Sequence, residues 1–264
     1  ATIESLRSLG VKVHVANFDQ NTKVKSLRSA MRIVDYKKYN GIVVLDADNV
    51  MKQNFLKVAS RHLSGGCRIM QCNRKPSNLD NALSVFNAIA DESNAKMLGK
   101  GANNLGLSSA LSDSAMIFKT TTFADIIFRQ SSIGGFDKEM ELELTKSKKF
   151  IHYIDKAIVY DEKMNSFKSY SNQRARCMQA QYSFFAKSIW NAFGELYRGN
   201  RNHFHNVIQL ALPPNALASV SLVIIIAAAA FLSNIFIMTL AVSLLIIDLL
   251  TYGLLIPMKW IYGY

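Results

Sequence analysis

Apolar and polar positions follow two different periods along the first two thirds of the chain. Helical spacing predicts helices over 2–9, 23–35, 50–63, 78–98, 123–128, 139–147 and 166–198. Strand-like runs stand at 11–15, 41–45, 67–72, 114–118 and 151–160, and a Gly/Asn-rich turn is expected over 99–106. The run 41–45 is apolar throughout, which is typical of a strand buried on both faces of a parallel sheet. Strands that alternate with helices predict an α/β fold.

The C-terminal part has a different pattern, because almost every position over 206–258 is apolar. No charged residue occurs between Ala216 and Ile247, a run longer than the roughly 20 residues that a membrane span needs. Ser233 and Asn234 divide this run and predict a transmembrane hairpin with spans at 215–232 and 235–256. Basic residues flank the hairpin and none lies in its turn, so both ends are expected in the cytoplasm. Asp248 is the one charge within the spans, and a snorkelling or helix-packing role is expected for it.

Three regions follow from this pattern: an α/β domain over 1–165, an interfacial helical region over 166–205 and the hairpin over 206–264. The chain has 264 residues and a formal net charge of +12, with the excess before residue 206. An anionic membrane surface and a phosphate-bearing substrate explain this charge. Nucleic acid is not expected as a partner, because no basic helix interleaved with aromatic residues is present. The three cysteines, Cys67, Cys72 and Cys177, fit no disulfide framework, which indicates a reducing compartment.

Two carboxylates directly after the apolar strand 41–45 are the strongest chemical signal. Asp46 and Asp48, two residues apart, could hold Mg²⁺ or Mn²⁺ together with a diphosphate, whose charge builds up as a bond to it breaks. The alternative is that both aspartates cap a helix that begins near Val50. Ligands of α/β sheets bind beyond the carboxyl ends of strands, which favours the metal hypothesis.

Two further clusters could carry chemistry. Gly134 and Gly135 allow a sharp turn, and the acids that follow include Asp137 and Glu139. One of these carboxylates could act as a general base, although acids at this position also favour a helix N-terminus. The third cluster is Gln173-Arg174-Ala175-Arg176, whose arginines suit phosphate recognition or form an ordinary solvated face. His203 and His205 flank Phe204 without a third metal ligand in view.

The order of these clusters, followed by a hairpin, resembles the processive family-2 glycosyltransferases, the group of cellulose, chitin and hyaluronan synthases. Residues 41–49 (GIVVLDADN) resemble the family's D-x-D strand, 134–139 (GGFDKE) its acceptor-loop region and 173–177 (QRARC) its Q-x-x-R-W motif. The motif's Trp is Cys177 here, and Ser112–Ala115 stands where many relatives have a G-S-G turn. The family's first strand, with its uridine-binding loop, has no counterpart, so a piece of a longer protein is expected.

The resemblance implies a GT-A, nucleotide-diphospho-sugar transferase fold and inversion at the anomeric carbon. It implies Asp48 as metal ligand, Asp46 as donor contact and Asp137 as base with Glu139 as its acidic companion. Gln173, Arg174 and Arg176 would line the acceptor end and the diphosphate. The implied partners are a nucleotide-sugar, with a UDP-sugar as first candidate, a glycan or lipid-linked acceptor, and further synthase subunits.

The expected protein is a metal-dependent hexosyltransferase of the inner or plasma membrane, with its catalytic domain in the cytoplasm and a role in polysaccharide biosynthesis. Two alternatives remain open. One is a non-processive transferase that adds a sugar to a lipid carrier, and the other is a degenerate, non-catalytic subunit of a polysaccharide synthase.

Overall fold

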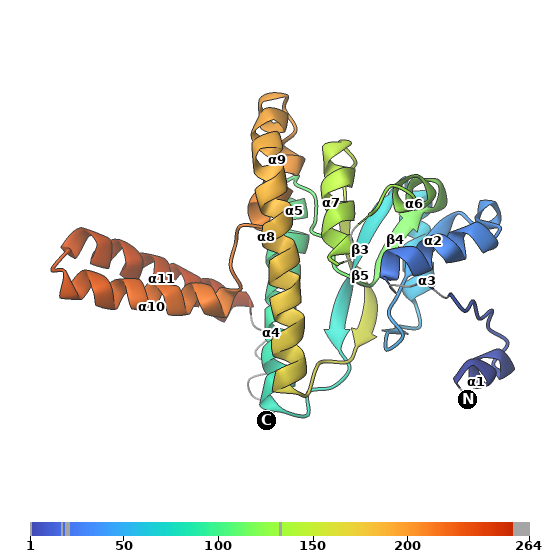
Figure 1. Ribbon diagram of the computed structural model, residues 1–264, viewed down its shortest axis with the longest axis horizontal. Helices are drawn as coiled ribbons and strands as arrows, with labels where there is room; N and C mark the ends of the chain where they lie inside the picture. Colours follow the sequence, from blue (N-terminus) through green and yellow to red (C-terminus); the bar gives the residue numbers. More distant parts are fainter. Residues whose placement is uncertain (1, 17, 19–21, 132–133, 256–264) are drawn as a thin grey trace.

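The computed structural model describes residues 2–16, 18, 22–131 and 134–255. Helices and strands alternate over the first two thirds of the chain, and helices alone follow (Figure 1). In chain order the elements are α1 (Thr2–Ser8), α2 (Lys23–Ile33), η1 (Tyr36–Lys38), β1 (Gly41–Val44), β2 (Val50–Met51), α3 (Phe55–Ser64), β3 (Ile69–Pro76), α4 (Ala82–Asn94), η2 (Ala95–Gly101), α5 (Ala102–Asn104), β4 (Met116–Lys119), α6 (Thr120–Ile127), α7 (Phe136–Lys146), β5 (His152–Asp161), α8 (Phe167–Tyr197), α9 (Arg201–Gln209), α10 (Asn215–Phe231) and α11 (Ile235–Leu255).

The strands form one mixed sheet in the order β1-β4-β3-β5-β2. Only β3 and β5 pair in parallel, and the three other pairings are antiparallel. The β3–β5 register shifts between Cys72 and Asn73, an irregularity that bends a sheet locally. The prediction of a doubly buried parallel strand at 41–45 is therefore wrong, because β1 pairs with β4 alone and antiparallel.

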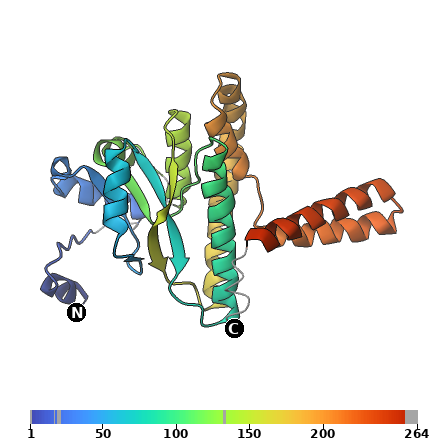
Figure 2. The ribbon, with the colours of Figure 1, turned by 180° about the vertical axis from the view of Figure 1, so that it is seen from behind.

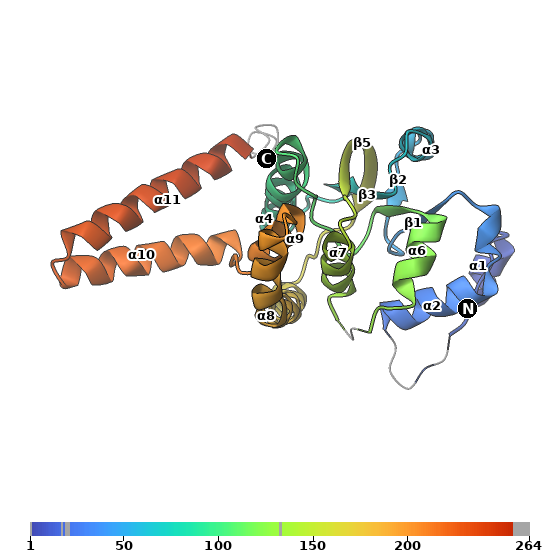
Figure 3. The same cartoon turned by 90° about the horizontal axis from the view of Figure 1, so that it is seen from above.

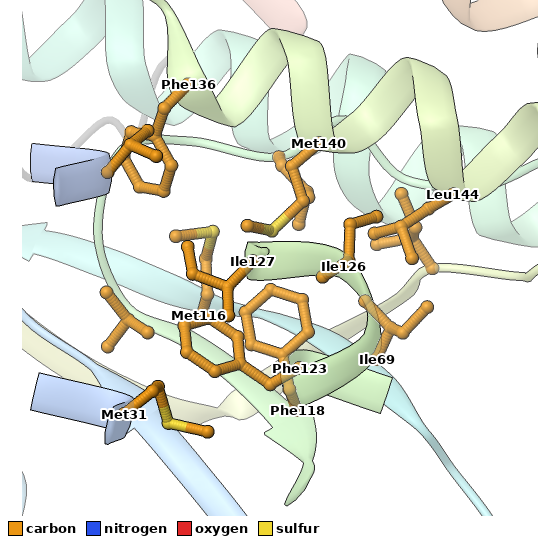
Figure 4. Packing of buried hydrophobic residues seen from close by; sticks show 14 residues of the cluster. Met31, Ile69, Met116, Phe118, Phe123, Ile126, Ile127, Phe136, Met140 and Leu144 are labelled. Carbon is orange, nitrogen blue, oxygen red and sulfur yellow. The ribbon is translucent and has the colours of Figure 1, made fainter. Parts of the chain in front are cut away.

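Side chains alternate between the two faces of the sheet and build a separate core on each. On one face Phe118 of β4 packs against Phe123 of α6, with ring centroids 5.1 Å apart, and Met140 of α7 closes the cluster (Figure 4). On the other face Phe55 and Ala59 of α3 cover Ile117 and Val159. The sheet is thus a layer between α3 on one side and α2, α6 and α7 on the other.

A wall of helices stands beyond α7. Viewed from above, α7 lies between the sheet and the group α4, α8 and α9 (Figure 3). Leu142 of α7 packs against Ala192 of α8 and Val207 of α9 in a third cluster of buried residues. Helix α8 has 31 residues and so runs along the whole wall (Figures 1 and 2). The sequence pattern did not predict α9 as a separate helix.

Two expectations for loops and strands are wrong. Residues 11–16 form no strand, and Val11 and Val15 are exposed, so this segment buries no apolar face that would dock it on the sheet. The turn expected over 99–106 begins late, because helical structure continues through η2 and α5 as far as Asn104. Gly99 serves a close contact and not a turn: a Cβ there would lie 2.7 Å from Cδ2 of Tyr153.

The predicted hairpin forms as two packed helices, α10 and α11, that project from the helix wall (Figures 1 and 3). Ser219 of α10 donates a 2.5 Å hydrogen bond to Asp248 of α11, which confirms the helix-packing role of that carboxylate. The prediction that these helices span a membrane is not supported: no helix within the described residues is long and apolar enough to cross one.

Candidate functional site

The turn after β1 carries the predicted acidic pair. Asp46 is partly buried, and its amide N–H donates to Ser114 Oγ at 2.9 Å. Asp48 is exposed, and one of its carboxylate oxygens accepts a 3.0 Å hydrogen bond from Asn49. Helix α3 begins only at Phe55, with Asn54 as its N-cap. The helix-capping alternative for Asp46 and Asp48 is therefore wrong.

Lys23, which the sequence analysis did not single out, bridges Asp46 and Asp113. Its Nζ lies 2.5 Å from Asp46 Oδ1, 2.6 Å from the Asp113 carbonyl oxygen and 3.4 Å from Asp113 Oδ1. The same ammonium lies 5.2 Å from the ring centroid of Phe136. Lys23 is the first residue of α2, where the Thr22 side chain caps the helix. One cation thus joins three segments that are far apart in sequence.

Asp137 lies in the first turn of α7, after the glycine bend. Gly135 has φ +67°, a left-handed conformation that suits glycine, and it precedes the helix directly. Burial raises the pKa of Asp137, and the Glu141 charge raises it further, while Lys138 opposes both. Burial also raises the pKa of Asp113, and the charges of Asp137 and Asp46 add to this effect against Lys23. Asp46, Asp113 and Asp137 therefore form an acid cluster, in which the charges of Asp46 and Asp137 both act on Asp113.

A buried ion pair on α7 fixes the loop that carries Asp113. Glu141 accepts the Leu111 amide N–H at 2.7 Å, and Lys138 donates to the Leu111 carbonyl at 2.7 Å. Lys138 and Glu141 are 3.1 Å apart, and Asn206 of α9 donates to the other Glu141 oxygen at 2.8 Å. Both backbone groups of Leu111 are thereby held by side chains that neighbour Asp137. This pair sets the distance between the Asp113 loop and the start of α7.

The turn before β4 contains one residue in the left-handed region, Ala115. It is fully buried and has φ +57°, a backbone region that costs an L-residue roughly 1–2 kcal/mol. A glycine would adopt this backbone without that cost, so the alanine destabilises the turn.

Glu139 hydrogen-bonds to the loop that precedes the glycine bend. Its carboxylate accepts hydrogen bonds from the Ser131 amide and hydroxyl, each at 3.0 Å. A helix turns by about 100° per residue, so Glu139 and Asp137, two positions apart, point in different directions. The role of acidic companion to Asp137, which the resemblance implies for Glu139, stays a prediction.

One of the three predicted polar residues on α8 faces the domain. Arg174 donates to Asn87 of α4 at 2.9 Å and lies 3.6 Å from Asp91. Gln173 and Arg176 are exposed. Burial raises the pKa of the Cys177 thiol, followed by the effect of the Asp137 charge, so this end of α8 lies beside the start of α7.

A buried network of charges supports this arrangement from behind. Lys163, whose side chain is 2% exposed, lies 2.7 Å from Asp91 and 3.0 Å from Asp161, and Arg74 pairs with Asp161. Burial by itself would raise the pKa of Asp91, but Lys163 and Arg74 outweigh it and lower the pKa. The sequence analysis missed Lys163 and Arg74, which carry no local motif.

Asp46 and Asp48 could offer at most two carboxylates to a divalent cation. No group of three or more His, Cys, Asp or Glu side chains that could hold a metal ion by itself is found in the described part of the chain. Mg²⁺ is commonly held by one or two carboxylates together with substrate phosphates. Asp46 and Asp48, on one turn, match that smaller set of ligands.

The structure thus combines a mixed α/β sheet, two aspartates in the turn after β1 and a half-buried aspartate at the start of α7. The family described as glycosyltransferase like family 2 matches residues 3–180, and the chain belongs to this family. It is accordingly a glycosyltransferase, with a nucleotide-sugar donor and an acceptor as its substrates, and its curled mixed sheet fits the GT-A fold. No curated protein matches the chain.

Proposed function

We propose that the protein moves a hexose from a nucleotide-diphospho-sugar, with a UDP-sugar as first candidate, to a hydroxyl of a growing glycan, with inversion at the anomeric carbon. The supporting observation is that Lys23 bridges Asp46 and Asp113, while the charge of Asp137 acts on both Asp113 and Cys177. These groups come from distant parts of the chain and bring a donor-side acid and a half-buried acid together.

Asp137 is the base in this proposal. The acceptor hydroxyl gives its proton to the Asp137 carboxylate as its oxygen attacks the anomeric carbon. The bond from that carbon to the diphosphate oxygen breaks, and the nucleoside diphosphate leaves with the electron pair. Burial raises the pKa of Asp137, and a general base works best when its pKa approaches the working pH.

The donor end is assigned to Asp46, Asp48 and Arg174. A bound Mg²⁺ or Mn²⁺ would neutralise charge on the departing diphosphate, with Asp48 as ligand. Lys23 already places an ammonium 2.5 Å from Asp46, so the Asp46 carboxylate is held in one orientation. Gln173 and Arg176 are exposed on α8 and stay available to an acceptor.

The site of action proposed is the cytoplasmic surface of a membrane. Large apolar side chains are exposed all along α10 and α11, among them Ile224, Phe231, Phe236 and Leu250. Apolar patches of this extent on a soluble protein usually mark an interaction site. The net charge of +12 adds attraction to anionic lipids. Flotation with anionic vesicles tests this, and a protein that stays at the bottom of the gradient contradicts it.

The transfer itself is tested with the protein at its natural length, labelled UDP-sugars and Mg²⁺ or Mn²⁺. Asp137→Asn is expected to lower transfer by about 10²–10⁴-fold while nucleotide binding persists. Asp80→Asn is the matched control, because Asp80 is exposed and does not belong to the acid cluster, and it should transfer like the unmodified protein. Full activity in Asp137→Asn would remove the assigned base. Tight donor binding without transfer in the unmodified protein would indicate the non-catalytic subunit.

Non-processive transfer is the second candidate, favoured by Cys177. The exposed Cys177 thiol lies near Asp137, at the position of the tryptophan in the Q-x-x-R-W motif that the chain resembles. The flat aromatic surface that this tryptophan would offer to a glycan is therefore missing. The product length decides: a single added sugar on the acceptor indicates non-processive transfer, and a ladder of long products indicates processive synthesis.

A further inference from the structure

A pocket lies between α7, α8 and α9, and none of Asp46, Asp113 and Asp137 lines it. It has a volume of about 350 Å³, within the range of roughly 300–1,000 Å³ that small-molecule sites occupy. Each of the two long walls contributes residues at i, i+3, i+4 and i+7 of its helix, so one stripe of each helix faces the pocket. The lining residues are Glu139, Leu142, Glu143 and Lys146 from α7, Phe184, Lys187, Ser188 and Asn191 from α8, and His203 from α9.

Some polar side chains of this α7–α8 pocket form hydrogen bonds within the protein, and others do not. Glu139 is bonded to Ser131, and Glu143 accepts a 3.0 Å hydrogen bond from Gln130. Within the described residues, in contrast, no hydrogen bond or ion pair engages four other side chains of the lining. These are Lys146, Lys187, Ser188 and Asn191. The pocket therefore offers two ammonium groups, a hydroxyl and an amide to a ligand, while its carboxylates are already engaged.

His203 adds a buried acceptor. The residue is 2% exposed, and its Nδ1 lies 3.3 Å from Thr145 Oγ1, whose hydroxyl donates to the Glu141 carbonyl. Nδ1 therefore carries the proton, and Nε2 presents a lone pair. Nε2 has no hydrogen-bond partner within the described part of the chain. Burial lowers the pKa of His203, which keeps the ring neutral and this lone pair free at neutral pH.

Helix α8 runs past both the acid cluster and the pocket. Cys177, which feels the Asp137 charge, lies about 15 Å of helix rise before Lys187. Between them Ala180 and Phe184 pack on the Gly135 bend, where a Cβ would lie 2.9 Å from the Ala180 Cβ and 3.3 Å from Phe184 Cε2. A glycan whose end lies at Asp137 therefore has to pass along the outer side of α8, around this packed contact, to reach the pocket.

We propose that the α7–α8 pocket binds an acidic sugar of the acceptor glycan, some units away from the reacting end. Lys146 and Lys187 take its carboxylate or phosphate, the Ser188 hydroxyl and the Asn191 amide bond its hydroxyl groups, and the Phe184 ring supports the apolar face of the sugar. The choice of an acidic sugar follows from the two free ammonium groups. The assignment to the acceptor rests on the proposed function.

The test measures binding of four probes to the protein at its natural length: an oligouronate, a neutral oligosaccharide of equal length, a sugar phosphate and inorganic phosphate. Lys146→Gln/Lys187→Gln should weaken binding of the acidic sugars by about tenfold or more, the loss typical of a charge-assisted hydrogen bond. Lys168→Gln, at an exposed lysine near the start of α8, is the matched control and should bind like the unmodified protein. A preference for the oligouronate or for the sugar phosphate tells which acidic group is recognised.

Three outcomes would contradict the proposal. The neutral oligosaccharide could bind as tightly as the oligouronate, inorganic phosphate could bind as tightly as either acidic sugar, or the Lys146→Gln/Lys187→Gln variant could bind the acidic sugars with unchanged affinity. In transfer assays the double variant should raise KM for an acidic acceptor and leave kcat unchanged. Absence of transfer in the unmodified protein, with the binding pattern intact, would contradict the proposed function and support the pocket as a binding site. The two failures are therefore distinguishable.

Discussion

The α/β domain and the hairpin of α10 and α11 differ in which side chains they bury. In the α/β domain charged side chains are buried in networks, and Lys163, whose side chain is 2% exposed, contacts both Asp91 and Asp161. In the hairpin, large apolar side chains face outward, and Ser219 donates to Asp248 between the two helices. Removal of one buried charge should therefore cost far more than removal of one hydrogen bond in the hairpin.

The largest effect on stability is expected from Lys163→Met. The change leaves Asp91 and Asp161 buried with less positive charge, and breaking a buried ion pair in this way costs about 3–5 kcal/mol. Urea unfolding followed by tryptophan fluorescence measures it. Lys168→Met, at an exposed lysine, should change stability by less than about 0.5 kcal/mol. Equal stabilities of the two variants would show that the network contributes nothing.

Glu141→Gln should have a smaller effect on stability and a marked one on activity. The amide keeps one acceptor oxygen for Leu111 or Asn206 but loses its charge beside Lys138, at a cost of about 1–3 kcal/mol. Because the Leu111 loop carries Asp113, kcat should fall more than KM rises. Thermal unfolding and steady-state kinetics measure both. A variant with normal kcat and lowered stability would reduce the ion pair to a purely structural role.

Asp137→Asn should raise the stability of the protein, whereas the two preceding substitutions lower it. The same change should remove activity. The native pKa of Asp137 is raised, so the unfolded state loses its proton first as pH rises from about 4. The carboxylate therefore destabilises the native state increasingly up to the raised native pKa, and by a constant amount above it. The advantage of Asn should be absent at pH 3 and present at pH 7. An advantage that does not change between these pH values would contradict the raised pKa.

The smallest effect is expected in the hairpin. Ser219→Ala removes the donor to Asp248 and should cost about 0.5–1.5 kcal/mol, the net value of one hydrogen bond. Hydrogen exchange of α10 and α11 amides should become faster, while amides of β3 and β5 stay unchanged. Faster exchange in the sheet as well would show that the two regions unfold together.

Local patterns predicted much of the fold. Helical spacing placed α2, α4 and α8 correctly, and strand patterns placed β3, β4 and β5. Errors arose where tertiary contacts outweigh local rules. Gly99 was interpreted as a turn residue, although it admits the ring of Tyr153, and the 11–15 segment alternates like a strand but pairs with nothing described.

The candidate site shows the limit of sequence motifs, because its contacts join distant parts of the chain. Asp46, Asp137 and Arg174 were chosen from motifs, and the structure brings them to one region. Lys23 escaped notice because its partner Asp113 is 90 positions away, and no periodicity encodes a contact of that kind. His203 was considered only as a metal ligand, and its free lone pair depends on Thr145, which only the folded chain places beside it.

The length of α8 has a mechanical consequence. Its 31 residues form a rod of about 46 Å that carries Arg174 and Cys177 near one end and Ala192 near the other. A stiff rod moves as one piece, so a tilt imposed at the end near α9 displaces the opposite end by a proportionate amount. A force on the α9 end of this helix would therefore also move Arg174 and Cys177, whose thiol lies near the proposed base Asp137.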